Sequence, residues 1–157
     1  MDDIINADLI EEIKELSKKA SIKYIAVPVY NIERAKKILL ALNFTDISDH
    51  RDEWSYNDTW GMSILMQRSN DVILRLCEEY IYPPAFQRVG RIAIEVEDPE
   101  ELGNDIVLYA NTMLPKMGNR VEKVADNSYY VLLPCIFGIP LEIIQKKSLS
   151  DGSEPTV

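Results

Sequence analysis

The sequence predicts an α+β protein made of two tandem βαβββ modules, with an additional helix at the N-terminus. The chain has 157 residues, of which 46% are hydrophobic, which suits one domain or two small modules that share a core. Strand-like and helix-like patterns follow one another in the same order twice. A shift of 67 residues aligns the first series with the second, so we interpret the chain as a tandem repeat.

Matching residues at both ends of each half carry this repeat. The shift superposes Ile25 on Ile92 and Glu33 on Glu100. The same shift places the run LRLCE, residues 74–78, on the run LEIIQ, residues 141–145. Because one offset aligns the first strand and the last strand of each half, two related modules are the economical explanation.

The first half begins with an amphipathic pattern at residues 2–19, with acidic residues early and lysines late, as the helix dipole prefers. We expect this helix to pack on the main domain or on a partner. Residues 22–29 have the β-branched composition of a strand, and Asn31 then caps a helix with an apolar face at residues 32–42. Three strands are predicted next, near residues 46–50, 60–67 and 72–78.

The second half repeats this order after a segment that contains Pro83 and Pro84 and that we interpret as a linker. A strand is predicted at residues 91–96, and Asp98 followed by Pro99 marks the start of a helix that ends near residue 113. Three strands follow, near residues 121–125, 129–134 and 141–145. The predicted boundaries are therefore an N-terminal helix at 1–20, a first module at 21–80, a linker at 81–90, a second module at 91–147 and a flexible tail at 148–157.

Charge and composition exclude several classes of function. The chain carries 17 Lys and Arg against 26 Asp and Glu, a net charge of −9, which repels nucleic acids and anionic membranes. It has no apolar run near the length of about 20 residues that spans a membrane. The acidic N-terminus and the separated thiols Cys77 and Cys135 predict a cytoplasmic protein without disulfides. Phosphate-binding loops, zinc-protease motifs and nucleophile elbows do not occur in the sequence.

At three places the sequence resembles the vicinal oxygen chelate superfamily, which includes glyoxalase I, extradiol dioxygenases and the fosfomycin- and bleomycin-resistance proteins. The run IKYIAVPVYNIERAKKILLALNF at residues 22–44 is similar to the opening strand and helix of that family. RIAIEVEDPEEL at 91–102 is similar to the second-module counterpart, and GIPLEIIQ at 138–145 to the closing strand. The resemblance implies that the two modules form a cupped mixed sheet.

In metal-using members of this family, four positions in the cup hold a divalent cation. The resemblance places Tyr24, Arg75, Arg91 and Glu142 at these positions. Glu142 alone keeps a ligand type of the family, because an arginine does not deprotonate to coordinate a cation and a phenol is a poor substitute for imidazole. We therefore expect no metal and no cofactor.

Two interpretations of the cup remain open. In the first, Glu142 orients one guanidinium while the other binds a carboxylate or phosphate of a ligand. In the second, Arg75, Arg91 and Glu142 neutralise one another and fill the centre of the cup. Trp54, Tyr56 and Trp60 are candidates for an aromatic wall against a flat ligand. Of the neighbours Tyr129 and Tyr130, only one can face the cup.

Three functions are therefore weighed. The first is a metal-free binding protein that holds a small aromatic or anionic molecule for sequestration, resistance or sensing. The second is a glyoxalase-like lyase or isomerase, or a dioxygenase-related enzyme, with Glu142 or Tyr24 as the catalytic acid or base. The third is an interaction module that assembles through its N-terminal helix. The resemblance also implies a homodimer.

Overall fold

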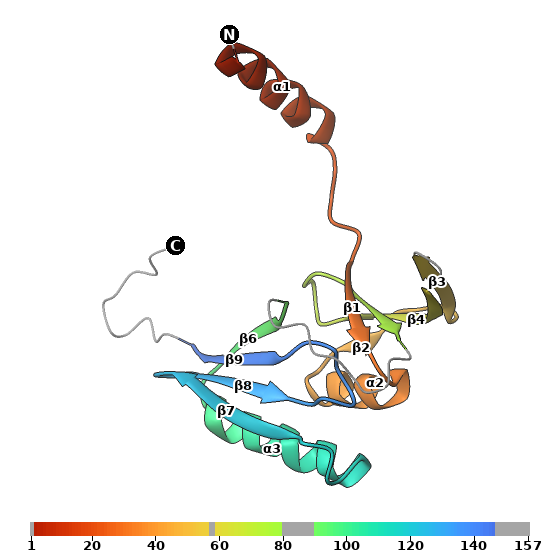
Figure 1. Cartoon of the computed structure of the whole chain (residues 1–157), viewed down its shortest axis with the longest axis vertical. Helices are drawn as coiled ribbons and strands as arrows, with labels where there is room; N and C mark the ends of the chain where they lie inside the picture. Colours follow the sequence, from red (N-terminus) through yellow and green to blue (C-terminus); the bar gives the residue numbers. More distant parts are fainter. Residues whose placement is uncertain (1, 57–58, 80–89, 147–157) are drawn as a thin grey trace.

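Two mixed β-sheets, each with one long helix, form the body of the protein (Figure 1). The computed structural model describes residues 2–56, 59–79 and 90–146. The first sheet has the order β1-β5-β4-β2, with β3 paired to β4, and the second has the order β6-β9-β8-β7. The predicted α+β class, with two repeated units and an N-terminal helix, is confirmed.

The elements follow the predicted order, with one additional strand in the first unit. The first unit contains β1 (Ile25–Val29), α2 (Ile32–Ala41), β2 (Thr45–Asp46), β3 (Asp52–Tyr56), β4 (Thr59–Gln67) and β5 (Leu74–Glu78). The second contains β6 (Ile92–Val96), α3 (Pro99–Met113), β7 (Arg120–Ala125), β8 (Ser128–Leu132) and β9 (Leu141–Gln145).

The internal repeat extends to the pairing register of the strands. β1 runs parallel to β5 with Ile25 opposite Leu74, and β6 runs parallel to β9 with Ile92 opposite Leu141. Each of these pairs is related to the other by the 67-residue shift read from the sequence. The two helices begin in the same way, because Asn31 and Asp98 each accept a hydrogen bond from the backbone N–H three residues later, at 2.9 Å and 3.0 Å.

Both units contribute to one hydrophobic core. The alternation of side chains along each strand sends one face of the first sheet toward α2 and one face of the second toward α3. The largest fully buried side chains come from both units and from the segment that joins β8 to β9: Phe137, Ile32, Ile38, Leu39, Met66, Leu76, Leu133, Ile136, Leu141, Ile143, Val27 and Val29.

The segment between β8 and β9 forms backbone hydrogen bonds with the outer edge of β1 and so joins the second unit to the first. Tyr30 N–H donates to the Ile136 carbonyl (3.0 Å), and Gly138 N–H donates to the Pro28 carbonyl (2.8 Å). Between these two bonds, Phe137 forms an antiparallel bridge with Val29. Its side chain is completely buried. The sheets are therefore joined by a short strand-like contact.

The structure differs from the predicted elements in the first unit. β3 was not predicted as a separate strand, because residues 49–53 (DHRDE) are uniformly polar and charged and show no alternation. The expected strand near residues 46–50 is reduced to the two residues of β2. Residues 81–89 of the predicted linker, and the predicted tail at 148–157, lie outside the described residues.

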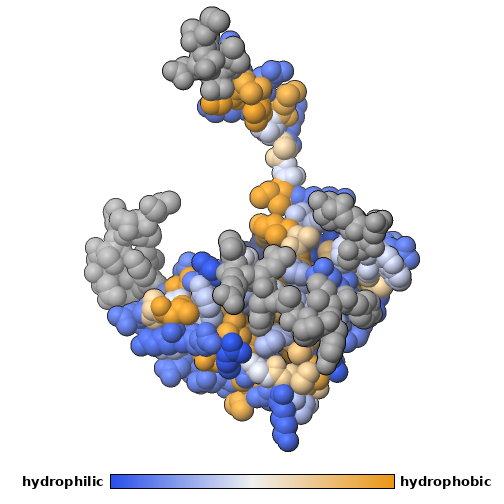
Figure 2. All heavy atoms as spheres, in the orientation of Figure 1, coloured by the Kyte–Doolittle hydropathy of each residue, from blue (hydrophilic) through white to orange (hydrophobic). Residues whose placement is uncertain are grey.

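The N-terminal helix α1 (Asp2–Ser17) projects away from the body in Figure 1. Its apolar side chains at Leu9, Ile10, Ile13 and Leu16 are between 51% and 80% exposed. Figure 2 shows hydrophobic spheres on the surface of the projecting helix. The expected packing of this helix on the main domain is therefore not observed, and the predicted homodimer stays a prediction. None of the helices in the described part of the chain has the length and apolar character needed to cross a membrane.

Candidate functional site

Arg75 lies at the centre of a polar cluster on the face of the first sheet opposite α2. Its Nε donates to Ser63 Oγ (3.0 Å), its Nη1 to the Tyr24 hydroxyl (2.9 Å) and its Nη2 to the Glu53 carbonyl (3.3 Å). The guanidinium also lies 5.2 Å from the centroid of the Tyr24 ring. These bonds fix the orientation of a half-buried cation while leaving one N–H on each terminal nitrogen. We call Tyr24, Ser63 and Arg75 the first-sheet site.

A small cavity adjoins the first-sheet site. It has a volume of about 160 Å³ and is lined by Lys23, Tyr24, Ser48, His50, Asp52, Ser63, Ile64, Leu65 and Arg75. His50 Nε2 and Asp52 Oδ1 lie 2.7 Å apart at its exposed rim. Two basic side chains, Lys23 and Arg75, therefore face a cavity whose carboxylate already has a partner.

Trp54 lies on the same face of the sheet, beside the first-sheet site. Its indole N–H donates to the Glu78 carbonyl (3.1 Å), and Trp54 is paired in register with Gly61. A Cβ atom on Gly61 would lie 2.1 Å from the Glu78 carbonyl oxygen and 2.8 Å from the indole nitrogen. The absence of a side chain at this glycine is what lets the indole reach its acceptor.

The second sheet carries a separate polar cluster. Arg91 Nε lies 2.8 Å from Glu142 Oε2, and the Arg91 guanidinium lies 5.4 Å from the centroid of the Tyr130 ring. Ser128 Oγ donates to Glu142 Oε1 (3.4 Å). We call Ser128, Tyr130, Arg91 and Glu142 the second-sheet cluster. Its guanidinium is balanced by a carboxylate, in contrast to Arg75.

The four predicted corner residues thus occupy two clusters. Tyr24 contacts Arg75 on the first sheet, and Arg91 contacts Glu142 on the second. The expected alternation of the tyrosines is seen: Tyr130 joins the second-sheet cluster, while the Tyr129 hydroxyl donates to Glu100 on α3 (3.3 Å).

One of the three predicted aromatic residues, Trp60, points away from the site. Trp60 is 67% exposed and, as the neighbour of Gly61 in β4, points to the opposite face of the sheet from Trp54. The side chain of Tyr56 lies outside the described residues. The prediction of a wall formed by all three side chains is therefore wrong for Trp60.

Sequence reasoning missed Ser63, which holds Arg75, and Ser128, which bonds to Glu142. A signal for Ser63 was present, because the 67-residue shift superposes it on Tyr130, the residue that lies against Arg91. Ser128 carried no comparable signal.

The donor chemistry of these clusters does not fit a divalent metal. Tyr24 and Arg75 lie on one sheet, and the single carboxylate of the set, Glu142, is bound to a guanidinium. Over residues 2–56, 59–79 and 90–146, no group of three or more His, Cys, Asp and Glu could hold a metal ion. The cations Arg75 and Arg91 would instead repel one.

Solved structures of known proteins share the arrangement of these two units. Glyoxalase I from Leishmania major matches with a TM-score of 0.55 and 16% identity, over 84% of this chain and 91% of that one. A fosfomycin resistance protein from Listeria monocytogenes matches with a TM-score of 0.53 and 10% identity, over 85% of this chain and 98% of that one. No protein-family model and no curated protein sequence matches the chain.

The chain has the vicinal oxygen chelate fold. Identities of 16% and 10% show a shared fold and leave the chemistry of the site to this chain's own residues. Two of the four residues that the resemblance assigned to metal-ligand positions, Arg75 and Arg91, carry guanidinium groups.

Cys77 provides a prediction about the environment of the first-sheet site. This thiol is half-buried, and its residue is paired in register with Ser63. Burial raises the pKa of Cys77, although the neighbouring Arg75 acts in the opposite direction. At a given pH a smaller fraction of the thiol is therefore thiolate, which is the reactive form.

We expect Cys77 to react slowly with iodoacetamide in a Cys135→Ser variant, where Cys77 is the sole thiol of the chain. The alkylation rate, followed by mass spectrometry against pH, should reach half its maximum above the value of about 8.5 that is typical of a free cysteine. The same variant unfolded in urea is the control. A midpoint in the folded protein at or below that of the unfolded chain contradicts the prediction.

Proposed function

We propose that this protein binds a small organic anion at the first-sheet site without a metal ion, for sequestration, resistance or sensing. The observation that carries the proposal is the environment of Arg75. All three of its hydrogen-bond acceptors, Ser63 Oγ, the Tyr24 hydroxyl and the Glu53 carbonyl, are uncharged. Within the described part of the chain no carboxylate forms an ion pair with it, so its charge is available to a ligand.

The contrast with the second-sheet cluster strengthens this argument. Burying a guanidinium away from water costs free energy unless an anion compensates its charge. Glu142 compensates the charge of Arg91, because Glu142 Oε2 lies 2.8 Å from Arg91 Nε. The Arg91 side chain is 39% exposed. The half-buried Arg75 lacks such a partner among the described residues. Lys23 also lines the cavity, and the Asp52 carboxylate in the same lining contacts His50.

The size of the cavity limits the ligand. A volume of about 160 Å³ is well below that of the pockets that hold drug-sized molecules, which run from about 300 to 1,000 Å³. A carboxylate or phosphate group with a short carbon skeleton suits this space. The Listeria protein of the same fold is complexed with Mn(II) and a dihydroxypropylphosphonic acid. In this chain a guanidinium would take the anion directly, as a bidentate partner.

A thermal-shift screen of short carboxylic, phosphoric and phosphonic acids tests the proposal. A ligand at about 100 times its dissociation constant should stabilise the native state by about 2.7 kcal/mol. In an Arg75→Ala variant, loss of a hydrogen bond between charged groups, worth about 1.5–3 kcal/mol, should weaken binding by about 10- to 100-fold.

Arg91→Ala is the matched control, because Arg91 is the arginine of the second-sheet cluster and is already paired with Glu142. The affinity of Arg91→Ala for the ligand should equal that of the unmodified protein. If Arg75→Ala leaves the affinity of every ligand found unchanged, or if the screen finds none, the proposal is overturned.

A further inference from the structure

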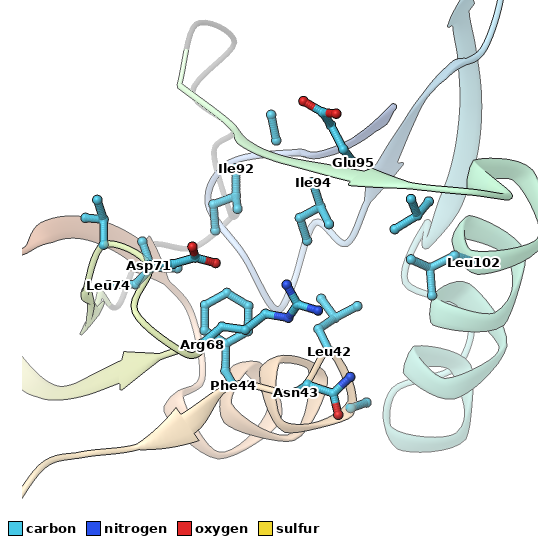
Figure 3. Close-up of a pocket in the computed structure, with 14 residues that line it drawn as sticks. Leu42, Asn43, Phe44, Arg68, Asp71, Leu74, Ile92, Ile94, Glu95 and Leu102 are labelled. Atoms are coloured by element: carbon cyan, nitrogen blue, oxygen red, sulfur yellow. The ribbon is translucent and has the colours of Figure 1, made fainter. Parts of the chain in front are cut away.

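A second, larger cavity lies between the two units, on the helix side of the sheets and away from the first-sheet site. Its volume is about 630 Å³, within the usual range of ligand pockets. In Figure 3, Ile92 and Ile94 point from β6 toward Phe44 and Leu42 across this space. The lining is Ala41, Leu42, Asn43, Phe44, Arg68, Asp71, Val72, Leu74, Ile92, Ala93, Ile94, Glu95, Val96 and Leu102.

One wall of this cavity is the open edge of β6. Ile92 N–H donates to the Pro140 carbonyl and Lys146 N–H donates to the Val96 carbonyl, so these residues direct their backbone groups toward β9. The alternate residues Ala93 and Glu95 therefore direct theirs toward the cavity. Among the described residues, no strand pairs with β6 on this side.

The first unit shows what occupies the equivalent edge. β1 is related to β6 by the 67-residue shift, and its outer edge is covered by residues 136–138 (Ile-Phe-Gly). The acceptor there is the Pro28 carbonyl, which corresponds to the Glu95 carbonyl, and the donor is Tyr30 N–H, which corresponds to Glu97 N–H. The buried Phe137 ring lies between these two hydrogen bonds.

The sequence explains why no described segment occupies the corresponding place beside β6. The same shift relates residues 136–138 to Ser69, Asn70 and Asp71, so a polar turn stands where the second unit has Ile-Phe-Gly. Asn70 is exposed, and Asp71 N–H is used inside the turn, where it donates to the Arg68 carbonyl (2.9 Å). This turn lines the cavity but supplies no large apolar side chain to fill it.

We propose that the cavity binds an extended peptide that carries a large apolar side chain, with an aromatic ring as the best fit. The peptide adds to the open edge of β6 as a short strand, accepting from Glu97 N–H and donating to the Glu95 carbonyl. Its central ring enters the space between Leu42, Phe44 and Ile94. Arg68 and Asp71, which reach over the same space in Figure 3, meet the polar groups of the peptide backbone.

A blocked heptapeptide, acetyl-Pro-Ser-Ile-Phe-Gly-Ile-Pro-amide, is a suitable probe because it reproduces residues 134–140 with serine in place of Cys135. Binding is measured by titration calorimetry and by chemical-shift changes in the amides of β6. We expect saturable binding, and at least tenfold weaker binding of the peptide in which asparagine replaces phenylalanine. That replacement copies the difference between Phe137 and Asn70.

Two protein variants fill the cavity: Leu102→Trp from α3 and Ala41→Trp at the end of α2. Each should weaken peptide binding at least tenfold at an unchanged or higher melting temperature. The use of two variants guards against one that fails to fold. Arg91→Ala, immediately before β6 and outside the lining of the cavity, should leave the affinity unchanged.

Two results overturn the proposal. The first is the absence of binding at millimolar peptide, or equal affinity for the two peptides. The second is peptide binding that persists in both tryptophan variants while the added peptide lowers the melting temperature of the protein. That outcome means that the peptide displaces residues 136–138 from β1 instead of occupying the cavity.

Discussion

Phe137→Ala should lower the free energy of unfolding by about 3–5 kcal/mol, the usual cost of truncating a buried phenylalanine. The ring is completely buried, and its residue bridges Val29 on the edge of β1. The substitution therefore opens a cavity at the contact that joins the two units. For a chain of this length, a shift of about 2–4 °C per kcal/mol predicts a melting temperature lower by about 6–20 °C.

Asn70→Ala is the matched control for this substitution. The 67-residue shift relates Asn70 to Phe137, but Asn70 is exposed in the turn between β4 and β5. Its truncation should change stability by no more than about 0.5 kcal/mol, as is typical of surface positions. Similar losses in the two variants, by urea denaturation, would show that residues 136–138 do not hold the units together.

The fold could be predicted from the sequence because the internal repeat presents the same pattern of elements in both units. The offset that aligns Ile25 with Ile92 also fixes the parallel pairing of β1 with β5 and of β6 with β9. A pattern that is ambiguous in one unit is thus resolved by its copy in the other. β3 escaped prediction because its pairing with β4, rather than any apolar alternation of its own, makes it a strand.

The candidate site was only partly accessible, because faces depend on how strands are paired. Trp54 is paired with Gly61, so residues with even numbers on β3 share a face with residues with odd numbers on β4. Grouping Trp60 with Trp54 ignored this change of parity across the hairpin. The different partners of Arg75 and Arg91 depend on how the strands are placed in space, which local sequence patterns do not encode.

Gly61→Ala should destabilise the protein by about 1–3 kcal/mol, the usual cost of forcing extra atoms into a packed site. The new methyl group would lie 2.1 Å from the Glu78 carbonyl oxygen, a backbone atom that moves only if β5 moves. It would also lie 2.8 Å from the Trp54 indole nitrogen, so it separates the donor and acceptor of the hydrogen bond between Trp54 and Glu78.

The effect on Trp54 distinguishes this mechanism from a general loss of stability. In a Trp60→Phe background, Trp54 is the single tryptophan of the chain, and its fluorescence reports on the indole directly. Gly61→Ala should shift that emission toward the red in the folded protein, because the indole loses its acceptor and becomes more exposed. Gly90→Ala is the control, since its Cβ meets only Ile139 at an ordinary 3.4 Å. A Gly61→Ala protein with unchanged emission and melting temperature would mean that β4 and β5 lie farther apart than described. The described arrangement of β4 and β5 around Arg75 would then be wrong.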